Sequence, residues 1–258
     1  MGLSVPRLLA WGLTVLVLSC PALVNANTVI YGDLYGATTD FLGVQETANS
    51  PGHTAPLFGA PTLVGNSLVF NHMSFVSQSN NGASDINDGQ LDTTIVTTNL
   101  PGYYINQLTL QEFGDTTLAG TGTSATYASV GSAITLTVLA LDDNEIPFAL
   151  IGTNLTFTNN GQWTLAGGPL TAQSWSGSIN FQMAPFLESF GITGQATEVA
   201  LTVDNTLATS SEANTEAFIA KKADGLSVTP IVVPEPGTLL LVILGGSFLL
   251  VQRFGRKN

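Results

Sequence analysis

The sequence predicts an all-β protein, an antiparallel β-sandwich or jelly-roll-like body followed by a C-terminal transmembrane helix. Apolar and polar residues alternate along several short runs; Ile134, Leu136 and Val138, for example, are interleaved with Thr135 and Thr137. This period of two is typical of strands with one buried face. Charged residues make up only 9% of the chain, against roughly 25% in average soluble domains, which leaves little solvated helix surface.

Turn-forming residues separate the apolar runs. The alternation predicts strands around residues 68–75, 103–113, 134–140, 155–157, 163–165, 179–183, 199–203 and 217–220. Turn signals lie at residues 80–82, 87–89, 100–102, 120–122, 142–144, 167–169 and 224–225. Asn159-Asn160-Gly161 is the clearest hairpin signal, because Asn and Gly accept positive φ. Asp224-Gly225 predicts a second hairpin turn.

The chain divides into three parts, of which residues 1–26 have the pattern of a secretory signal peptide. Arg7 precedes an apolar run over residues 8–19, Pro21 follows it, and small residues lead to predicted cleavage between Ala26 and Asn27. The body is predicted at 27–229 and a tail at 230–258.

Two alternatives for the N-terminal segment remain open. One is a lipoprotein signal that ends at Cys20, and the other is a signal anchor that stays uncut. Cys20 is the only cysteine. Removal of residues 1–26 therefore excludes disulfides and thiol chemistry from the mature chain.

The C-terminal tail combines a rigid motif, an apolar segment and a basic end. Pro234-Glu235-Pro236 precedes a transmembrane helix predicted at about 238–252. Its membrane-inserting residues are Leu239, Leu240, Leu241, Val242, Ile243, Leu244, Phe248, Leu249, Leu250 and Val251, and the basic residues are Arg253, Arg256 and Lys257. The apolar part would span about 21 Å as a helix, short of the ~30 Å hydrocarbon core. By the positive-inside rule, the basic end stays cytoplasmic and the body lies outside.

These three tail elements, in this order, resemble the PEP-CTERM sorting signal. The resemblance covers about residues 232–258. It implies insertion into the inner membrane and recognition of Pro234, Glu235 and Pro236 by an exosortase-type transpeptidase. An ordinary C-terminal anchor that follows Pro-Glu-Pro is the alternative.

The charge distribution argues against nucleic acid as a partner. All but one of the 18 acidic residues lie between residues 27 and 233, where Lys221 and Lys222 are the only basic residues. Phosphate backbones would repel such a body.

Several residues of the body are candidates for binding or catalysis. Asp85, Asn87, Asp88 and Asp92 gather oxygen ligands in what reads as a loop, so they are weak calcium candidates, although their spacing departs from the EF-hand. The two histidines, His53 and His72, are candidates for a metal site or a catalytic pair. The carboxylates Glu112, Asp115 and Glu188 are candidates for glycoside hydrolysis. Trp163 and Trp175 are either core residues or sugar-stacking platforms.

The sequence therefore predicts an exported, non-enzymatic protein without a cofactor, delivered through the inner membrane to the cell surface or extracellular matrix. An alternative is a carbohydrate- or calcium-binding module of a biofilm matrix, with extracellular polysaccharide as its partner. A third interpretation is an extracellular glycan hydrolase.

Overall fold

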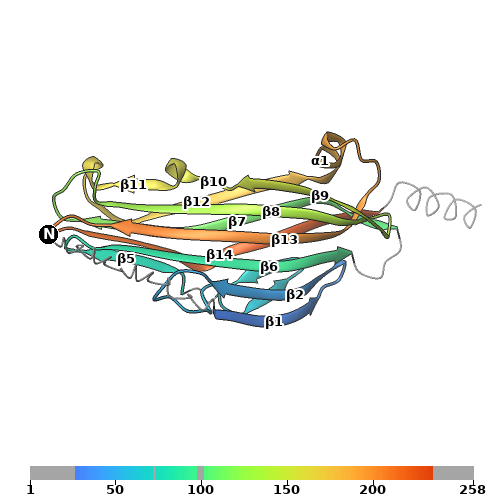
Figure 1. The fold of residues 1–258 in the computed structure, drawn as a ribbon, viewed down its shortest axis with the longest axis horizontal. Helices are drawn as coiled ribbons and strands as arrows, with labels where there is room; N and C mark the ends of the chain where they lie inside the picture. The colour runs from blue at the N-terminus through green and yellow to red at the C-terminus, as the bar shows by residue number, and fades with distance from the viewer. Residues whose placement is uncertain (1–26, 72–73, 98–101, 235–258) are drawn as a thin grey trace, which may run out of the picture.

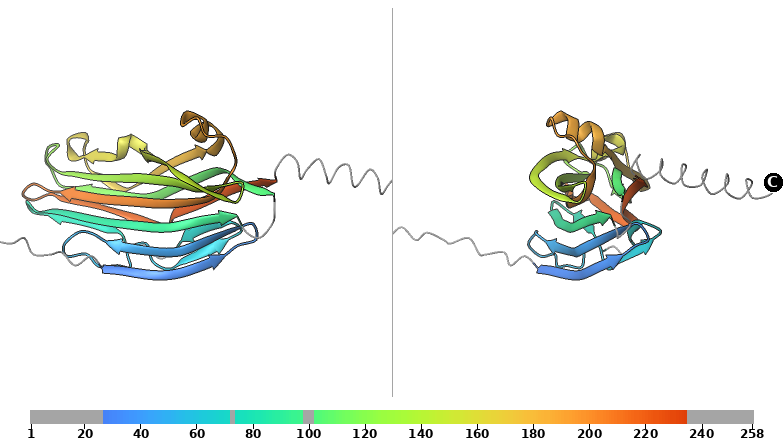
Figure 2. Two further views of the ribbon diagram at one scale, coloured as in Figure 1. Left: turned by 45° about the vertical axis from the view of Figure 1, so that its right-hand side comes forward. Right: turned by 90° about the vertical axis from the view of Figure 1, so that its right-hand side faces the viewer.

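The computed structural model describes residues 27–71, 74–97 and 102–234, which form two seven-stranded sheets that face each other (Figure 1). Every strand pairing in the described residues is antiparallel. The predicted antiparallel β-sandwich is confirmed, and Figure 2 shows its two layers from further sides.

The first sheet has β13 at its centre. Its order is β1 (Asn27–Tyr35), β2 (Thr39–Ala48), β6 (Ser84–Thr97), β13 (Ala196–Ser210), β8 (Tyr127–Leu141) and β11 (Gln162–Thr164), with β9 (Asn144–Asn154) also paired to β8.

The second sheet is arranged around β14. Its order is β10 (Thr156–Phe157), β12 (Leu170–Gln182), β7 (Tyr103–Ala119), β14 (Glu216–Pro234), β4 (Ser67–Phe70) and β3 (Pro61–Val64), with β5 (Val76–Asn80) also paired to β14. The described helical elements are η1 (Thr158–Gly161), η2 (Leu165–Gly167) and α1 (Met183–Ser189).

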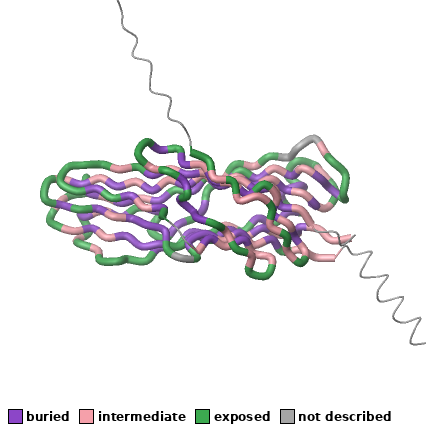
Figure 3. Tube along the Cα trace, turned by 90° about the horizontal axis from the view of Figure 1, so that it is seen from below, coloured by how far each residue is buried: buried purple, intermediate pink, exposed green. Residues whose placement is uncertain are grey.

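One hydrophobic core fills the space between the sheets. In β13, the residues Val199, Leu201, Val203 and Leu207 face inward and are at most 1% exposed, because successive strand residues point to opposite faces. Figure 3 shows buried segments along the strands and exposed ones at the connections. Most of the long strands run along the molecule, so many inward positions contribute to the same core (Figure 1).

The turn signal at residues 142–144 is confirmed, and the structure forms a hairpin there. Leu141 and Asn144 pair across the β8–β9 hairpin, and the two residues between them, Asp142 and Asp143, have φ values of 48° and 60°. Asp is one of the few side chains that tolerate this left-handed conformation.

The hairpin predicted at residues 159–161 is wrong in its pairing. Asn159, Asn160 and Gly161 do adopt positive φ, but β10 before them pairs in the second sheet and β11 after them pairs in the first. The segment therefore crosses between the two layers.

The hairpin turn predicted at Asp224-Gly225 is also wrong. Asp224 has a φ of 57°, but it lies in an irregularity within β14, between Lys221, which pairs with Gly114, and Leu226, which pairs with Glu112. The predicted strand at 217–220 is confirmed as part of β14. Pairing with β7 continues on both sides of the irregularity, so β14 stays one strand.

Candidate functional site

The predicted sorting residues lie at and beyond the end of the last strand. Pro234 is the final residue of β14 and pairs with Tyr103. Glu235, Pro236, the predicted membrane segment and the basic residues lie outside the described residues, as does Ala26. Asn27 opens β1. Within residues 27–71, 74–97 and 102–234, no helix has the length and apolar character needed to cross a bilayer.

The predicted calcium loop at residues 85–92 is a strand. Asp85, Asn87, Asp88 and Asp92 all lie in β6, where alternation points the first two and the last two to opposite faces of the sheet. Asn87 is 1% exposed and donates from Nδ2 to the Val76 carbonyl at 2.9 Å. The four side chains therefore do not converge, and the described part of the chain contains no group of three or more His, Cys, Asp or Glu residues placed to hold a metal.

The outward-facing carboxylates of β6 interact with β13. Thr206 donates to Asp88 at 2.9 Å, and Thr202 donates to Asp92 at 2.7 Å. Burial raises the pKa of Asp204, and the neighbouring charges of Asp88 and Asp92 raise it further. These contacts give the three carboxylates a structural role between neighbouring strands.

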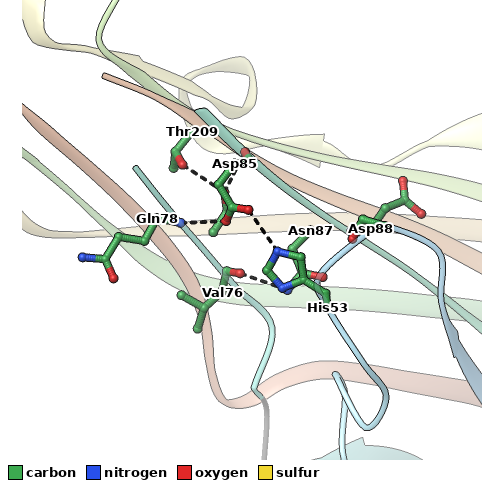
Figure 4. A network of polar contacts seen from close by, with 9 residues as sticks. His53, Val76, Gln78, Asp85, Asn87, Asp88 and Thr209 are labelled. Carbon is green, nitrogen blue, oxygen red and sulfur yellow. Dashed lines mark hydrogen bonds and ion pairs between the residues drawn. The ribbon is translucent and has the colours of Figure 1, made fainter. Parts of the chain in front are cut away.

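His53 contacts Asp85 in a small polar network (Figure 4). Its Nε2 lies 3.0 Å from Oδ1 of Asp85, and the Gln78 backbone N–H donates to the other carboxylate oxygen at 3.0 Å. Burial raises the pKa of Asp85, but the hydrogen bonds from His53, Gln78 and Ser77 outweigh it and hold that pKa below its usual value. The network fastens the segment around His53 to β6. His72 lies outside the described residues.

The two tryptophans in the part of the chain that the structure describes pack into the core. Trp163 is 6% exposed and Trp175 is 3% exposed, with their ring centroids 6.4 Å apart. Neither presents an open ring face for sugar stacking. The groove beside Trp163, about 440 Å³ in volume, has no carboxylate in its lining, which consists of Asn159, Asn160, Gln162, Trp163, Thr164, Gly167, Gly168 and Leu170.

The carboxylates considered for glycoside hydrolysis occupy three different environments. Glu188 is exposed on α1, Asp115 forms an ion pair with Lys222 at 2.7 Å, and Glu112 is completely buried. A hydrolytic pair must flank a substrate in a cleft. Glu112 cannot belong to such a pair, because a completely buried carboxylate does not reach a substrate.

The most unusual chemistry in the described residues surrounds Lys221, deep between the sheets. Its Nζ lies 2.6 Å from Oε2 of Glu112 and 2.5 Å from Oδ1 of Asn205. Ser132 donates to the other oxygen of Glu112 at 3.2 Å. Lys221 and Glu112 come from β14 and β7 of the second sheet, whereas Asn205 and Ser132 come from β13 and β8 of the first. We call these four residues the Lys221 cluster.

Aromatic rings close over the Lys221 cluster. The Lys221 Nζ lies 5.6 Å from the ring centroid of Phe58 and 5.4 Å from that of Phe75. The side chains of Lys221 and Glu112 have no exposed surface. Burial lowers the pKa of Lys221, and Glu112 opposes this only in part. The cluster therefore places an amine, a carboxyl group and a carboxamide together without bulk water.

The sequence identifies Glu112 as a candidate carboxylate and Lys221 only as one of two basic residues, so it does not predict the Lys221 cluster. The sequence does contain a signal for the cluster, because the alternation of apolar and polar residues shows which strand positions face inward. Glu112 is in register with Leu108 and Leu110 on the inward face of β7, and Lys221 continues the inward series of Ala217 and Ile219. Charged residues at such positions are rarely buried without a partner.

A second buried carboxylate supports the aromatic cover. Glu46 is 1% exposed and accepts the backbone N–H groups of Leu57 at 2.5 Å and Phe58 at 2.9 Å. Burial raises the pKa of Glu46 in spite of these hydrogen bonds. Glu46 thereby holds the backbone of the segment that places Phe58 over Lys221.

Comparisons with known proteins do not assign a family. No protein-family model matches the chain, and no curated protein matches it. Solved structures similar to it include the family 11 xylanase from Neocallimastix patriciarum, with 10% identity and a TM-score of 0.21, and a loop-swap mutant of its Xyn11A, with 9% identity and a TM-score of 0.22. Each alignment covers 80% of this chain and 96% of the other. At these TM-scores, the likeness carries no argument about activity.

Proposed function

We propose that this chain is an exported, non-enzymatic β-sandwich protein, which a PEP-CTERM tail delivers to the cell surface or extracellular matrix. The observation that carries the proposal is the position of β14. This strand ends at Pro234, so the rest of the Pro-Glu-Pro motif follows directly after the last strand of the core. The motif therefore begins where the described strands end, which supports its recognition by a sorting enzyme.

The interior of the described body supports a structural role. Its candidate catalytic carboxylates are paired within the fold or lie apart, and its tryptophans fill the core. An exosortase-type transpeptidase and the inner membrane are the partners that the tail implies. The acidic body, in which Lys221 and Lys222 are the only cations, favours solubility outside the cell.

Two tail variants test the sorting function in a host that carries an exosortase. Glu235→Ala removes the charge of the motif, and deletion of residues 253–258 removes the basic end that the positive-inside rule requires. We expect the parent chain to give a shorter, relocated product, and both variants to accumulate as a longer, membrane-associated form. Immunoblots of membrane and surface fractions measure this.

Glu216→Ala is the matched control, because Glu216 is exposed on β14 and lies well before the motif. We expect it to be processed like the parent chain. If both tail variants match the parent in product size and location, the sorting function is wrong.

A further inference from the structure

We propose that Lys221 and Asn205 become joined by an intramolecular isopeptide bond, formed inside the folded chain with Glu112 as the proton carrier. The nucleophilic nitrogen already touches the carboxamide, at 2.5 Å from its oxygen, and the carboxyl group of Glu112 lies 2.6 Å from the same nitrogen. The bond would link β13 of the first sheet to β14 of the second.

The reaction needs the amine of Lys221 without its extra proton. Removal of an ammonium group from water is costly, so burial drives a lysine toward its neutral amine. Burial lowers the pKa of Lys221, in the direction the reaction requires. Transfer of one proton from Nζ to Glu112 gives a neutral amine beside a neutral carboxylic acid, and that amine can act as a nucleophile.

The bond-forming step is balanced within the cluster. The Nζ lone pair attacks Cγ of Asn205, Glu112 passes a proton to Nδ2, and the Cγ–Nδ2 bond breaks to release ammonia. Glu112 recovers a proton from the attacking nitrogen, so it ends the step as it began, as a general acid and base. One amide replaces another, and nothing is oxidised or reduced.

The surroundings of Asn205 favour the departure of ammonia. Its Nδ2 is buried and has no hydrogen-bond partner among the residues that the structure describes. Departure of this group therefore breaks no hydrogen bond in the described fold. Ser132 holds Glu112 from the opposite sheet, which keeps the carboxyl group beside the attacking nitrogen of Lys221.

The fold supplies proximity and excludes water. Fixing two reactants in contact replaces an encounter between separate molecules, and well-oriented intramolecular reactions reach effective concentrations on the order of 10⁵ M and above. Phe58 and Phe75 cover Lys221, and their rings lie 5.1 Å apart. The absence of bulk water removes the competing hydrolysis of the carboxamide.

Digestion of the full-length protein after glutamate residues gives a direct test. Cleavage after Glu198, Glu212 and Glu216 places Asn205 in peptide 199–212 and Lys221 in the separate peptide that begins at Ala217, since the Glu235–Pro236 bond resists these proteases. We expect mass spectrometry of the denatured, digested protein to find these two peptides joined, at their summed mass less one ammonia. Fragmentation should locate the link at Asn205 and Lys221.

Two separate peptides with intact Asn205 and Lys221 would overturn the proposal and leave the cluster as a buried ion pair. Loss of ammonia from peptide 199–212 alone would also overturn it, because that product is a cyclised asparagine without a cross-link. The wild-type digest therefore decides the question even if a variant fails to fold.

Variants then test the roles of the residues. Lys221→Met and Glu112→Gln should each abolish the joined peptide, the first by removing the nucleophile and the second by removing the proton carrier. The neighbouring ion pair supplies the matched controls, since Lys222 and Asp115 lie on the same two strands 2.7 Å apart. Lys222→Met and Asp115→Asn should keep the joined peptide. A joined peptide in folded Glu112→Gln protein would overturn the role of Glu112.

Discussion

At the scale of single residues, the molecule is distinguished by charged and amide side chains at positions where alternation calls for apolar ones. Glu46, Glu112, Asn205 and Lys221 are all at most 3% exposed. A buried polar group is tolerated when its hydrogen bonds are made, and it is costly when they are lost. Each of these residues therefore constrains the neighbours that satisfy it.

Replacement of Glu46 by leucine should destabilise the fold through the groups that it leaves behind. The backbone N–H groups of Leu57 and Phe58 would lose their acceptor. Each buried donor without a partner costs about 1–3 kcal/mol. We expect the free energy of unfolding, measured by urea titration, to fall by at least that amount. Glu216→Leu is the control on an exposed strand position, and an equal loss in both variants would contradict the prediction.

Glu46 should also make stability depend on pH. Because burial raises the pKa of Glu46, the folded chain binds its proton up to a higher pH than the unfolded chain does. Stability falls with rising pH wherever the folded state binds more protons. The advantage of the wild type over Glu46→Leu should therefore be largest in acid and decrease as pH rises from the ordinary glutamate pKa to the raised one. Urea titrations across this range measure the difference, and an advantage that grows with pH would contradict it.

At the scale of strands, close approach fixes where glycine is required. A Cβ added at Gly114 of β7 would lie 2.1 Å from Cζ2 of Trp175 and 2.2 Å from the Ala220 carbonyl oxygen. Gly114 pairs with both Trp175 of β12 and Lys221 of β14, so it lies where three strands meet. A side chain at this place would push neighbouring strands apart.

Gly114→Ala should therefore lower the free energy of unfolding by about 1–3 kcal/mol, the usual cost of overpacking. Gly131→Ala in β8 is a matched control of opposite sign, because a Cβ there meets nothing within 4 Å. Alanine at that exposed strand position should stabilise by about 0.5–1 kcal/mol. Thermal and urea unfolding of both variants measures the contrast. Equal effects would show that the close approach at Gly114 is unimportant.

The same packing explains which elements the sequence could and could not predict. Alternation identified parts of β8 and β13 and the beginning of β14, because it reports directly which face is buried. Residues 87–89 resemble a turn but lie within β6. Gly89 is required there because a Cβ would lie 2.6 Å from Leu57 and 2.9 Å from Phe75. From composition alone, a glycine that close packing requires cannot be distinguished from a glycine that a turn requires.

Turn signals predicted backbone conformation better than they predicted pairing. Asn159 and Asp224 both have positive φ, yet one lies in a crossing between sheets and the other within a strand. The Lys221 cluster was hidden for a similar reason. Phase alone shows that Glu112, Asn205 and Lys221 face inward, but only the assignment of strands to two opposed sheets brings them together.

At the scale of the whole molecule, the two sheets share one core, which predicts cooperative unfolding. Trp163 belongs to the first sheet and Trp175 packs against it from the second, so their fluorescence reports on the separation of the sheets. Far-UV circular dichroism reports on the strands themselves. We expect both signals to change at one urea concentration, as in two-state unfolding. Two separate midpoints would mean that the layers come apart before the strands unfold.

The path of β14 has a mechanical consequence. This strand pairs with β7 from Glu216, opposite Ala119, to Pro234, opposite Tyr103, and it ends towards the right-hand end of the molecule in Figure 1. Under the proposed sorting function, a pull on the anchored body enters at Pro234 and runs along the strand axis. The hydrogen bonds to β7 then share the load in shear and resist it together, where bonds pulled crosswise would open one after another. The strand nearest the attachment point is thus also the one that a tensile force is least able to peel away.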